Sequence, residues 1–298
     1  REFALFGEAY FQLTPQFKAT LGLRYFDAKN SIDNLEDGYF TGDPNLVVGE
    51  QPEKGFNPKL SLTYQIDPDK MLYGVVSRGF RLGGVNDVVS LLFCADELPK
   101  DEAGNPTFPR FFESDFLWNY ELGFKGKWAG GKLLTNAAIF YNDWQNLQLS
   151  RPLECGYSYM DNVGEARTLG AELEVKAKLN TRLEIGGGLG ILDAKITDGG
   201  AFDNVVEAGD RIVFTPNLTA NANLQYNIPL KDDALLYFWS NLQYVSERLN
   251  TFSPEDPAEA FLIFEPYTLI NARIGWEFSN YRFSVFGRNL TNTIANFG

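Results

Sequence analysis

The stretch RTLGAELEVKAKL, residues 167–179, decides the fold because its side chains alternate in polarity. After Arg167 the odd positions are apolar, whereas the even positions include Glu172, Glu174 and Lys176. In an extended strand, successive side chains point to opposite faces. This segment therefore presents one apolar face and one charged face, a pattern that is typical of a wall between hydrocarbon and water.

The same alternation recurs along the chain and predicts twelve strands. Aromatic residues gather near the strand ends, for example Tyr25, Trp128 and Trp276, where membrane barrels carry their aromatic girdles. The predicted strands span residues 2–13, 17–28, 54–66, 71–81, 115–128, 132–146, 163–179, 182–195, 215–228, 234–246, 266–278 and 281–289.

Short turns and long loops alternate strictly between these strands. Outer-membrane barrels have this arrangement, with tight turns on one side of the membrane and long loops on the other. We therefore predict an all-β fold, an antiparallel transmembrane β-barrel that forms one domain over residues 1–298. A soluble β-sandwich with alternating faces is the alternative. The predicted long loops span about 29–53, 82–114, 147–162, 196–214 and 247–265.

Composition excludes several classes of function. The chain has no histidine, so Ser-His-Asp catalysis and imidazole metal ligands are absent. Its net charge of −13 disfavours nucleic acid as a partner. No stretch approaches the ~18 apolar residues of a transmembrane helix. We predict no enzymatic activity, no cofactor and no metal site, and we assign the Glu172 and Glu174 pair to a hydrated lumen.

Arginines and aromatic residues near the loop bases are the candidate ligand contacts. The arginine fork suits carboxylate or catecholate groups, and aromatic rings suit flat hydrophobic or sugar faces. Equally, the arginines could pair with acids across the lumen, and the aromatic rings could lie at the lipid interface. The candidates are Arg78, Arg81, Arg110, Trp144, Tyr157, Tyr159 and Arg167.

Four motifs resemble those of TonB-dependent outer-membrane receptors. They are similar to the family's strand motifs, occur in the family's order and cover nearly the whole chain. The motifs are LYGVVSRGFR at 72–81, YELGFKG at 120–126, NVGEAR at 162–167 with GAELE at 170–174, and FGRNLTN at 286–292.

The resemblance implies a 22-stranded barrel in the bacterial outer membrane, closed by an N-terminal plug and driven by the TonB complex. Such receptors import scarce nutrients such as ferric siderophores, cobalamin, haem or saccharides, and a ferric siderophore is the expected ligand here. The chain shows no plug, no TonB box, no export signal and no closing strand, and its topology would leave both ends on the long-loop side. We expect a partial barrel from the C-terminal part of such a receptor, in contact with outer-membrane lipid.

Two alternatives stay open at this point. A self-sufficient 12-stranded barrel would be a passive pore, since such barrels have even strand numbers. A soluble or cell-surface β-rich binding module would stay monomeric without detergent, whereas open barrel edges and a lipid-facing band would aggregate.

The only two cysteines, Cys94 and Cys155, fall in neighbouring long loops. Exported proteins meet an oxidising compartment, so an even pair predicts a disulfide between these loops. The alternative is two free thiols whose Cα atoms lie beyond the ~7 Å that a disulfide can bridge.

Thiol titration tests the predicted disulfide. The unreduced protein is expected to show no reactive thiol in denaturant, and reduction should release two. Two reactive thiols before reduction would contradict the pairing.

Overall fold

The protein is described here by a computed structural model that is almost entirely β-strand. Its one helix among the described residues, α1 (Leu91–Cys94), is a single turn, and no helix there is long and apolar enough to cross a membrane. The structure describes residues 1–38, 42–162, 164–200, 206–231, 233–250, 252 and 263–296.

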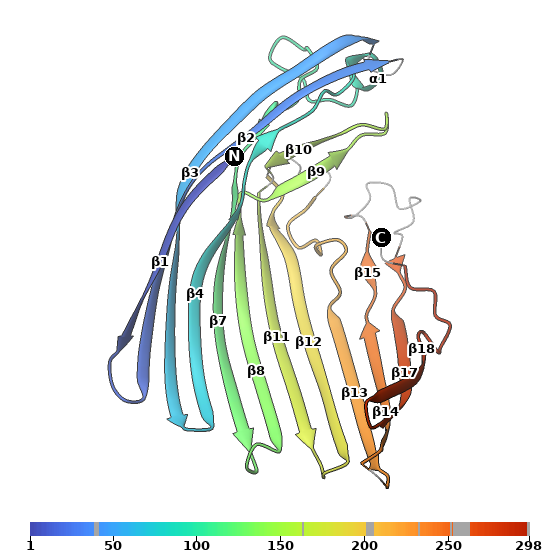
Figure 1. The fold of residues 1–298 in the computed structure, drawn as a ribbon. Helices are drawn as coiled ribbons and strands as arrows, with labels where there is room; N and C mark the ends of the chain where they lie inside the picture. Colours follow the sequence, from blue (N-terminus) through green and yellow to red (C-terminus); the bar gives the residue numbers. More distant parts are fainter. Residues whose placement is uncertain are drawn as a thin grey trace.

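Twelve strands form a single antiparallel sheet, and each of them pairs with the sheet strands that come before and after it along the chain. The sheet curves like part of a barrel wall, with β1 and β18 as its two edges (Figure 1). The predicted all-β antiparallel fold is therefore confirmed. The strands are β1 (Glu2–Gln12), β2 (Phe17–Gly38), β3 (Gly42–Asp67), β4 (Lys70–Arg81), β7 (Asp115–Trp128), β8 (Leu133–Gln145), β11 (Glu165–Lys178), β12 (Leu183–Asp198), β13 (Leu218–Pro229), β14 (Leu235–Val245), β17 (Tyr267–Phe278) and β18 (Tyr281–Gly287).

The strand register aligns apolar residues with apolar residues, and polar positions with polar ones, on neighbouring strands. Leu173 lies opposite Ala137 and Leu189. Its neighbour Glu174 lies opposite Asn136 and Gly188. We call the face that carries Leu173 the outer face and the face that carries Glu174 the inner face.

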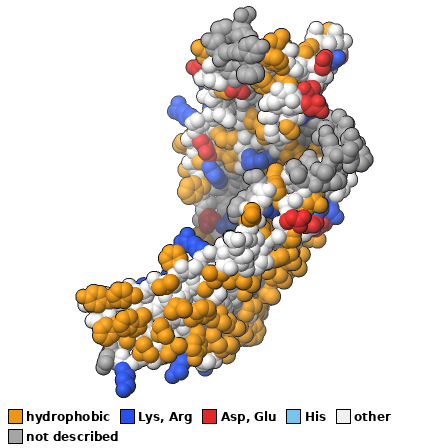
Figure 2. Space-filling view, turned by 90° about the vertical axis from the view of Figure 1, so that its right-hand side faces the viewer, with side chains coloured by type: hydrophobic (Ala, Val, Ile, Leu, Met, Phe, Trp, Pro, Cys, Tyr) orange, Lys and Arg blue, Asp and Glu red, His pale blue; other side chains and the backbone are white. Residues whose placement is uncertain are grey.

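The outer face is apolar and uncovered. Leu122, Ile139 and Leu173 are 56%, 57% and 45% exposed, and Figure 2 shows hydrophobic side chains over much of the lower part of the molecule. The other sheets of the described residues are two-stranded pairs, so no second sheet packs on these rows as a sandwich would require. Such a face suits hydrocarbon.

The two ends of the sheet differ. Tight turns lie at one end in Figure 1, and the long connections with their additional short strands lie at the other end, which we call the rim. Most of the buried residues belong to the rim rather than to the strands below it. The short strands are β5 (Gly84–Val85), β6 (Phe111–Phe112), β9 (Gln148–Pro152), β10 (Ser158–Asn162), β15 (Arg248–Leu249) and β16 (Ile263–Phe264).

The prediction of a loop at 29–53 was largely wrong. Strands β2 and β3 continue through it as one paired hairpin, up to the pair Gly38 and Gly42. A cross-strand ion pair, Lys29 with Glu50 at 2.5 Å, and continued alternation extend the pairing of this polar segment.

The other predicted loops differ less from the structure. The range 82–114 contains α1 with β5 and β6, and 147–162 contains the β9–β10 hairpin. Parts of the remaining two, residues 201–205, 251 and 253–262, lie outside the described residues, as does residue 163 of a predicted strand.

A matched pair of substitutions tests the assignment of the two faces. Ala137 lies between Phe124 and Leu173 on the outer face, and Ala138 lies between Gly123 and Glu172 on the inner face. In the protein expressed from its complete gene and folded into lipid vesicles, Ala137→Arg should lower the free energy of unfolding by about 2–4 kcal/mol. Ala138→Arg should cost much less because water reaches that face.

Equilibrium unfolding in denaturant measures both values. An equal cost at the two positions, or a larger cost for Ala138→Arg, would show that the outer face does not meet hydrocarbon.

Candidate functional site at the rim

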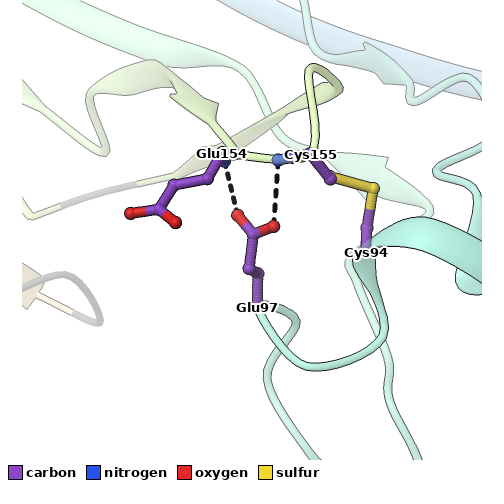
Figure 3. The surroundings of a disulfide bond; sticks show 4 residues. All are labelled: Cys94, Glu97, Glu154 and Cys155. Atoms are coloured by element: carbon purple, nitrogen blue, oxygen red, sulfur yellow. Dashed lines mark hydrogen bonds between the residues drawn. A yellow bond between two sulfur atoms is a disulfide. The ribbon is translucent and has the colours of Figure 1, made fainter.

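A disulfide joins two of the rim connections. Cys94, at the end of α1, is bonded to Cys155, in the turn between β9 and β10, with their Cα atoms 5.5 Å apart. The Glu97 carboxylate accepts hydrogen bonds from the backbone N–H groups of Glu154 and Cys155, the latter at 2.9 Å (Figure 3). The predicted disulfide is present. The Glu97 carboxylate next to it, which we call the Glu97 clip, holds the same turn.

A small apolar core surrounds this disulfide. Val89, Leu98, Leu153 and Tyr159 are buried together with Cys94. Because this core draws on both connections, residues 82–114 and 147–162 form one folded unit at the rim. We call it the rim unit.

Buried polar groups complete the rim unit. The Asn86 side chain is 6% exposed; it donates to the carbonyl oxygens of Pro109 and Met160 and accepts the Met160 N–H at 2.7 Å. The Gln148 amide donates to the carbonyl oxygens of Leu82 and Glu113. Each of these amides has its hydrogen bonds satisfied only when the two connections are together.

Two of the predicted ligand contacts lie in the core of the rim unit. Tyr159 is 2% exposed, and its hydroxyl accepts a hydrogen bond from Arg151 at 3.3 Å. Burial raises the pKa of Tyr159 and also that of the nearby Asp161 carboxyl. Tyr157 packs against the same core. The structure therefore gives Tyr159 a packing role, and a ligand contact by either tyrosine stays a prediction.

Two other predicted residues, Arg81 and Trp144, meet directly below the rim unit. The Arg81 guanidinium pairs with the Asp115 carboxylate, donates to the Gln148 carbonyl oxygen at 3.0 Å and lies 4.8 Å from the centre of the Trp144 ring. The Asp115 side chain is 1% exposed, whereas that of Arg81 is 48% exposed. This guanidinium is thus held by a buried carboxylate and a carbonyl oxygen, while about half of the Arg81 side chain is exposed.

The three remaining candidates lie apart from Arg81. Arg110 donates to the Val48 carbonyl oxygen on the extended hairpin. Arg78 and Arg167 stand in the rows of the outer face, so they do not face the hollow side of the sheet. Arg167 lies 3.8 Å from Asp193 on the same outer face, so this ion pair does not cross the lumen, and a ligand contact by Arg167 stays a prediction.

The inner face below the rim is polar and concave. A hollow of about 660 Å³ is lined by Glu121, Glu172 and Glu174 among other residues. The Tyr73 hydroxyl donates to Glu121 at 2.6 Å, and the Tyr73 ring covers Gly123, where a Cβ atom would lie within 2.4 Å of it. The position of Glu172 and Glu174 in this hollow agrees with their assignment to a hydrated lumen. No group of three or more acidic or cysteine residues in the described part of the chain is arranged to hold a metal ion.

Sequence reasoning missed Asp115, Gln148, Asn86 and Glu97. Each is a polar residue in or next to a loop, and from the sequence alone such a residue is expected to lie on the solvated surface. Only their partners, which lie more than thirty residues away for Asp115 and Glu97, show that they are structural.

Comparisons with known proteins identify the family. The family model for the TonB dependent receptor-like β-barrel matches residues 1–290. The metal-pseudopaline receptor CntO of Pseudomonas aeruginosa is 23% identical over 207 residues, which are 69% of this chain and 25% of that receptor.

Solved structures of such receptors share the fold. The ferric yersiniabactin uptake receptor FyuA of Yersinia pestis superposes with a TM-score of 0.76 at 22% identity, over 98% of this chain and 40% of that one. The ferripyoverdine receptor of the outer membrane of Pseudomonas aeruginosa gives 0.67 at 17% identity, over 98% and 35%.

The chain thus spans only a quarter to two fifths of these relatives. Within that span, the family model, the antiparallel sheet and the apolar outer face agree. The chain belongs to the TonB-dependent receptor β-barrel family, whose members are transport receptors of the bacterial outer membrane.

Proposed function

We propose that this chain is the barrel wall of a receptor for active uptake of a chelated metal, with a ferric siderophore as the leading candidate. The observation that carries the proposal is the half-exposed Arg81 guanidinium beside Trp144, between the rim unit and the polar hollow. The relatives support this class of ligand, because their names refer to metal-pseudopaline, ferric yersiniabactin and ferripyoverdine.

The chemistry of this pair suits an anionic chelate. Asp115 fixes the orientation of the guanidinium, and the remaining N–H donors of Arg81 match carboxylate or catecholate oxygens. The Trp144 ring provides a flat apolar surface for the organic part of a chelator. Because Arg81 is already held, less conformational entropy is lost when a ligand binds.

The inner face suits contact with a plug that would couple transport to the TonB complex. Gly186 and Gly188 on β12 bring the backbone close to the hollow surface, and carboxylates line the same hollow. A plug segment with hydrogen-bond donors would therefore fit against this wall.

A passive pore of these twelve strands alone is disfavoured. Such a pore requires β1 to pair with β18, and in the described residues these two strands are the unpaired edges of the sheet. The exposed apolar outer face likewise disfavours a soluble binding module.

Uptake measurements test the proposed function. Cells that lack the complete gene should lose uptake of at least one ⁵⁵Fe³⁺ chelate from a panel of catecholate, hydroxamate and carboxylate siderophores, and the gene on a plasmid should restore it. Uptake must also stop when TonB is deleted. Solute entry that persists without TonB and depends only on solute size would instead indicate a pore.

Two variants test the binding role of Arg81. In Arg81→Gln/Asp115→Asn both charges are removed together, so that no buried carboxylate is left without a partner. The affinity for the transported chelate should fall about tenfold or more, because a hydrogen bond to a charged group contributes about 1.5–3 kcal/mol. Trp144→Ala should also weaken binding.

Arg182→Gln, in the tight turn before β12, is the matched control and should bind as the wild type does. Chelate titration of the purified receptors measures these affinities. Wild-type affinity in the double variant would exclude Arg81 from the binding site.

A further inference from the structure

A row of polar and aromatic side chains crosses the outer face just above its apolar band. Strand register places Arg78 opposite Trp118, and then Asp143, Arg167 and Lys195 follow on successive strands. Because neighbouring strands lie about 4.8 Å apart, these five side chains form a continuous belt across β4, β7, β8, β11 and β12. We call them the cation row.

An apolar groove lies directly below the cation row. Val76, Tyr120, Tyr141 and Leu169 occupy the next row of the same face, two residues away on each strand. These residues, with others from β3 to β8, line a groove of about 360 Å³ on the outer face. The outer-face side chains that line it are Leu60, Leu62, Val76, Tyr120, Leu122, Ile139, Tyr141 and Leu169, and the lining is completed by Gly74, Val75, Glu121 and Phe140.

Within the cation row, Arg78 lacks a partner of opposite charge. In the described part of the chain its guanidinium forms no ion pair or hydrogen bond; it lies over the Phe116 ring, 3.8 Å from the ring centre, and its buried Nε has no acceptor. By contrast, Arg167 and Lys195 both lie near Asp193, at 3.8 and 3.2 Å.

We propose that the cation row and the groove bind one phosphate-bearing lipid of the outer leaflet. One acyl chain would lie in the groove, and the phosphate would accept hydrogen bonds from Arg78. Phosphate oxygens match the guanidinium fork, and the Phe116 ring, over which the guanidinium lies, holds that fork in place. The order of the two features, charge toward the rim and apolar groove toward the bilayer centre, is the order of headgroup and chain in such a lipid.

This site is independent of the proposed transport function, because it lies on the opposite face from Arg81 and the hollow. Charge complementarity supports a lipid with a negative headgroup. The three cations of the row face two carboxylates, Asp143 and Asp193, so one positive charge is left over, and Arg78 is the cation without a carboxylate nearby.

Lipid titration followed by native mass spectrometry tests the site in the detergent-solubilised receptor expressed from its complete gene. The probes are dipalmitoyl phosphatidic acid, dipalmitoylglycerol with the same chains but no phosphate, and inorganic phosphate. The wild type should retain one phosphatidic acid. Dipalmitoylglycerol and inorganic phosphate should each bind at least about tenfold more weakly, because each supplies half of the contacts.

Variants locate the bound lipid. Arg78→Gln should weaken phosphatidic acid binding about fivefold, the effect of about 1 kcal/mol for a basic residue at a membrane surface. Arg78→Lys should restore most of the affinity. Leu169→Trp, which fills the groove and leaves the charges unchanged, should weaken phosphatidic acid binding as well.

Arg282→Gln is the control, since Arg282 on β18 pairs with Glu277 on β17, at the far edge of the sheet from the cation row. Undiminished binding in Arg78→Gln, or an equal loss in Arg282→Gln, would overturn the site. Inorganic phosphate that binds as tightly as phosphatidic acid would overturn the role of the groove.

Discussion

The structure depends on the hydrogen-bonded ladder between neighbouring strands. Hydrocarbon offers no partner for a backbone N–H or C=O group, so a membrane wall made of strands must pair each strand with the next. Twelve strands do so here in simple sequence order. Once this pairing is fixed, each side chain points to one of the two faces of the sheet. The alternation of apolar and polar residues within each strand therefore gives the whole sheet one apolar face and one polar face.

Features that depend on one segment at a time could be predicted from the sequence. Strand β7 covers the predicted range 115–128, because the alternation and the flanking turn residues lie within that segment. The hairpin beyond residue 28 could not be predicted in this way. Its polar residues resemble a loop until Lys29 is seen next to Glu50, and that pairing joins residues far apart in the sequence.

In the candidate site, too, features that depend on single residues could be predicted, whereas contacts between residues far apart in the sequence could not. The disulfide followed from the number of cysteines and the compartment, whereas the Glu97 clip beside it required the folded loops. Arg81 and Trp144 were recognised by residue type alone. The buried partner of Arg81, Asp115, becomes evident only when the register aligns the end of β4 with the start of β7.

The contrast between Arg78 and Arg81 shows that the face to which a side chain points determines where its counter-charge comes from. Both belong to one motif on one strand, but they are three positions apart, and residues an odd number of positions apart on a strand point to opposite faces. Arg81 stands on the inner face and pairs with a buried carboxylate, so the protein supplies its counter-charge. Arg78 stands above an apolar band, where further protein carboxylates would be costly to place. A counter-charge for Arg78 is therefore best supplied by the membrane itself, whose headgroups carry phosphate at the level where the apolar band ends.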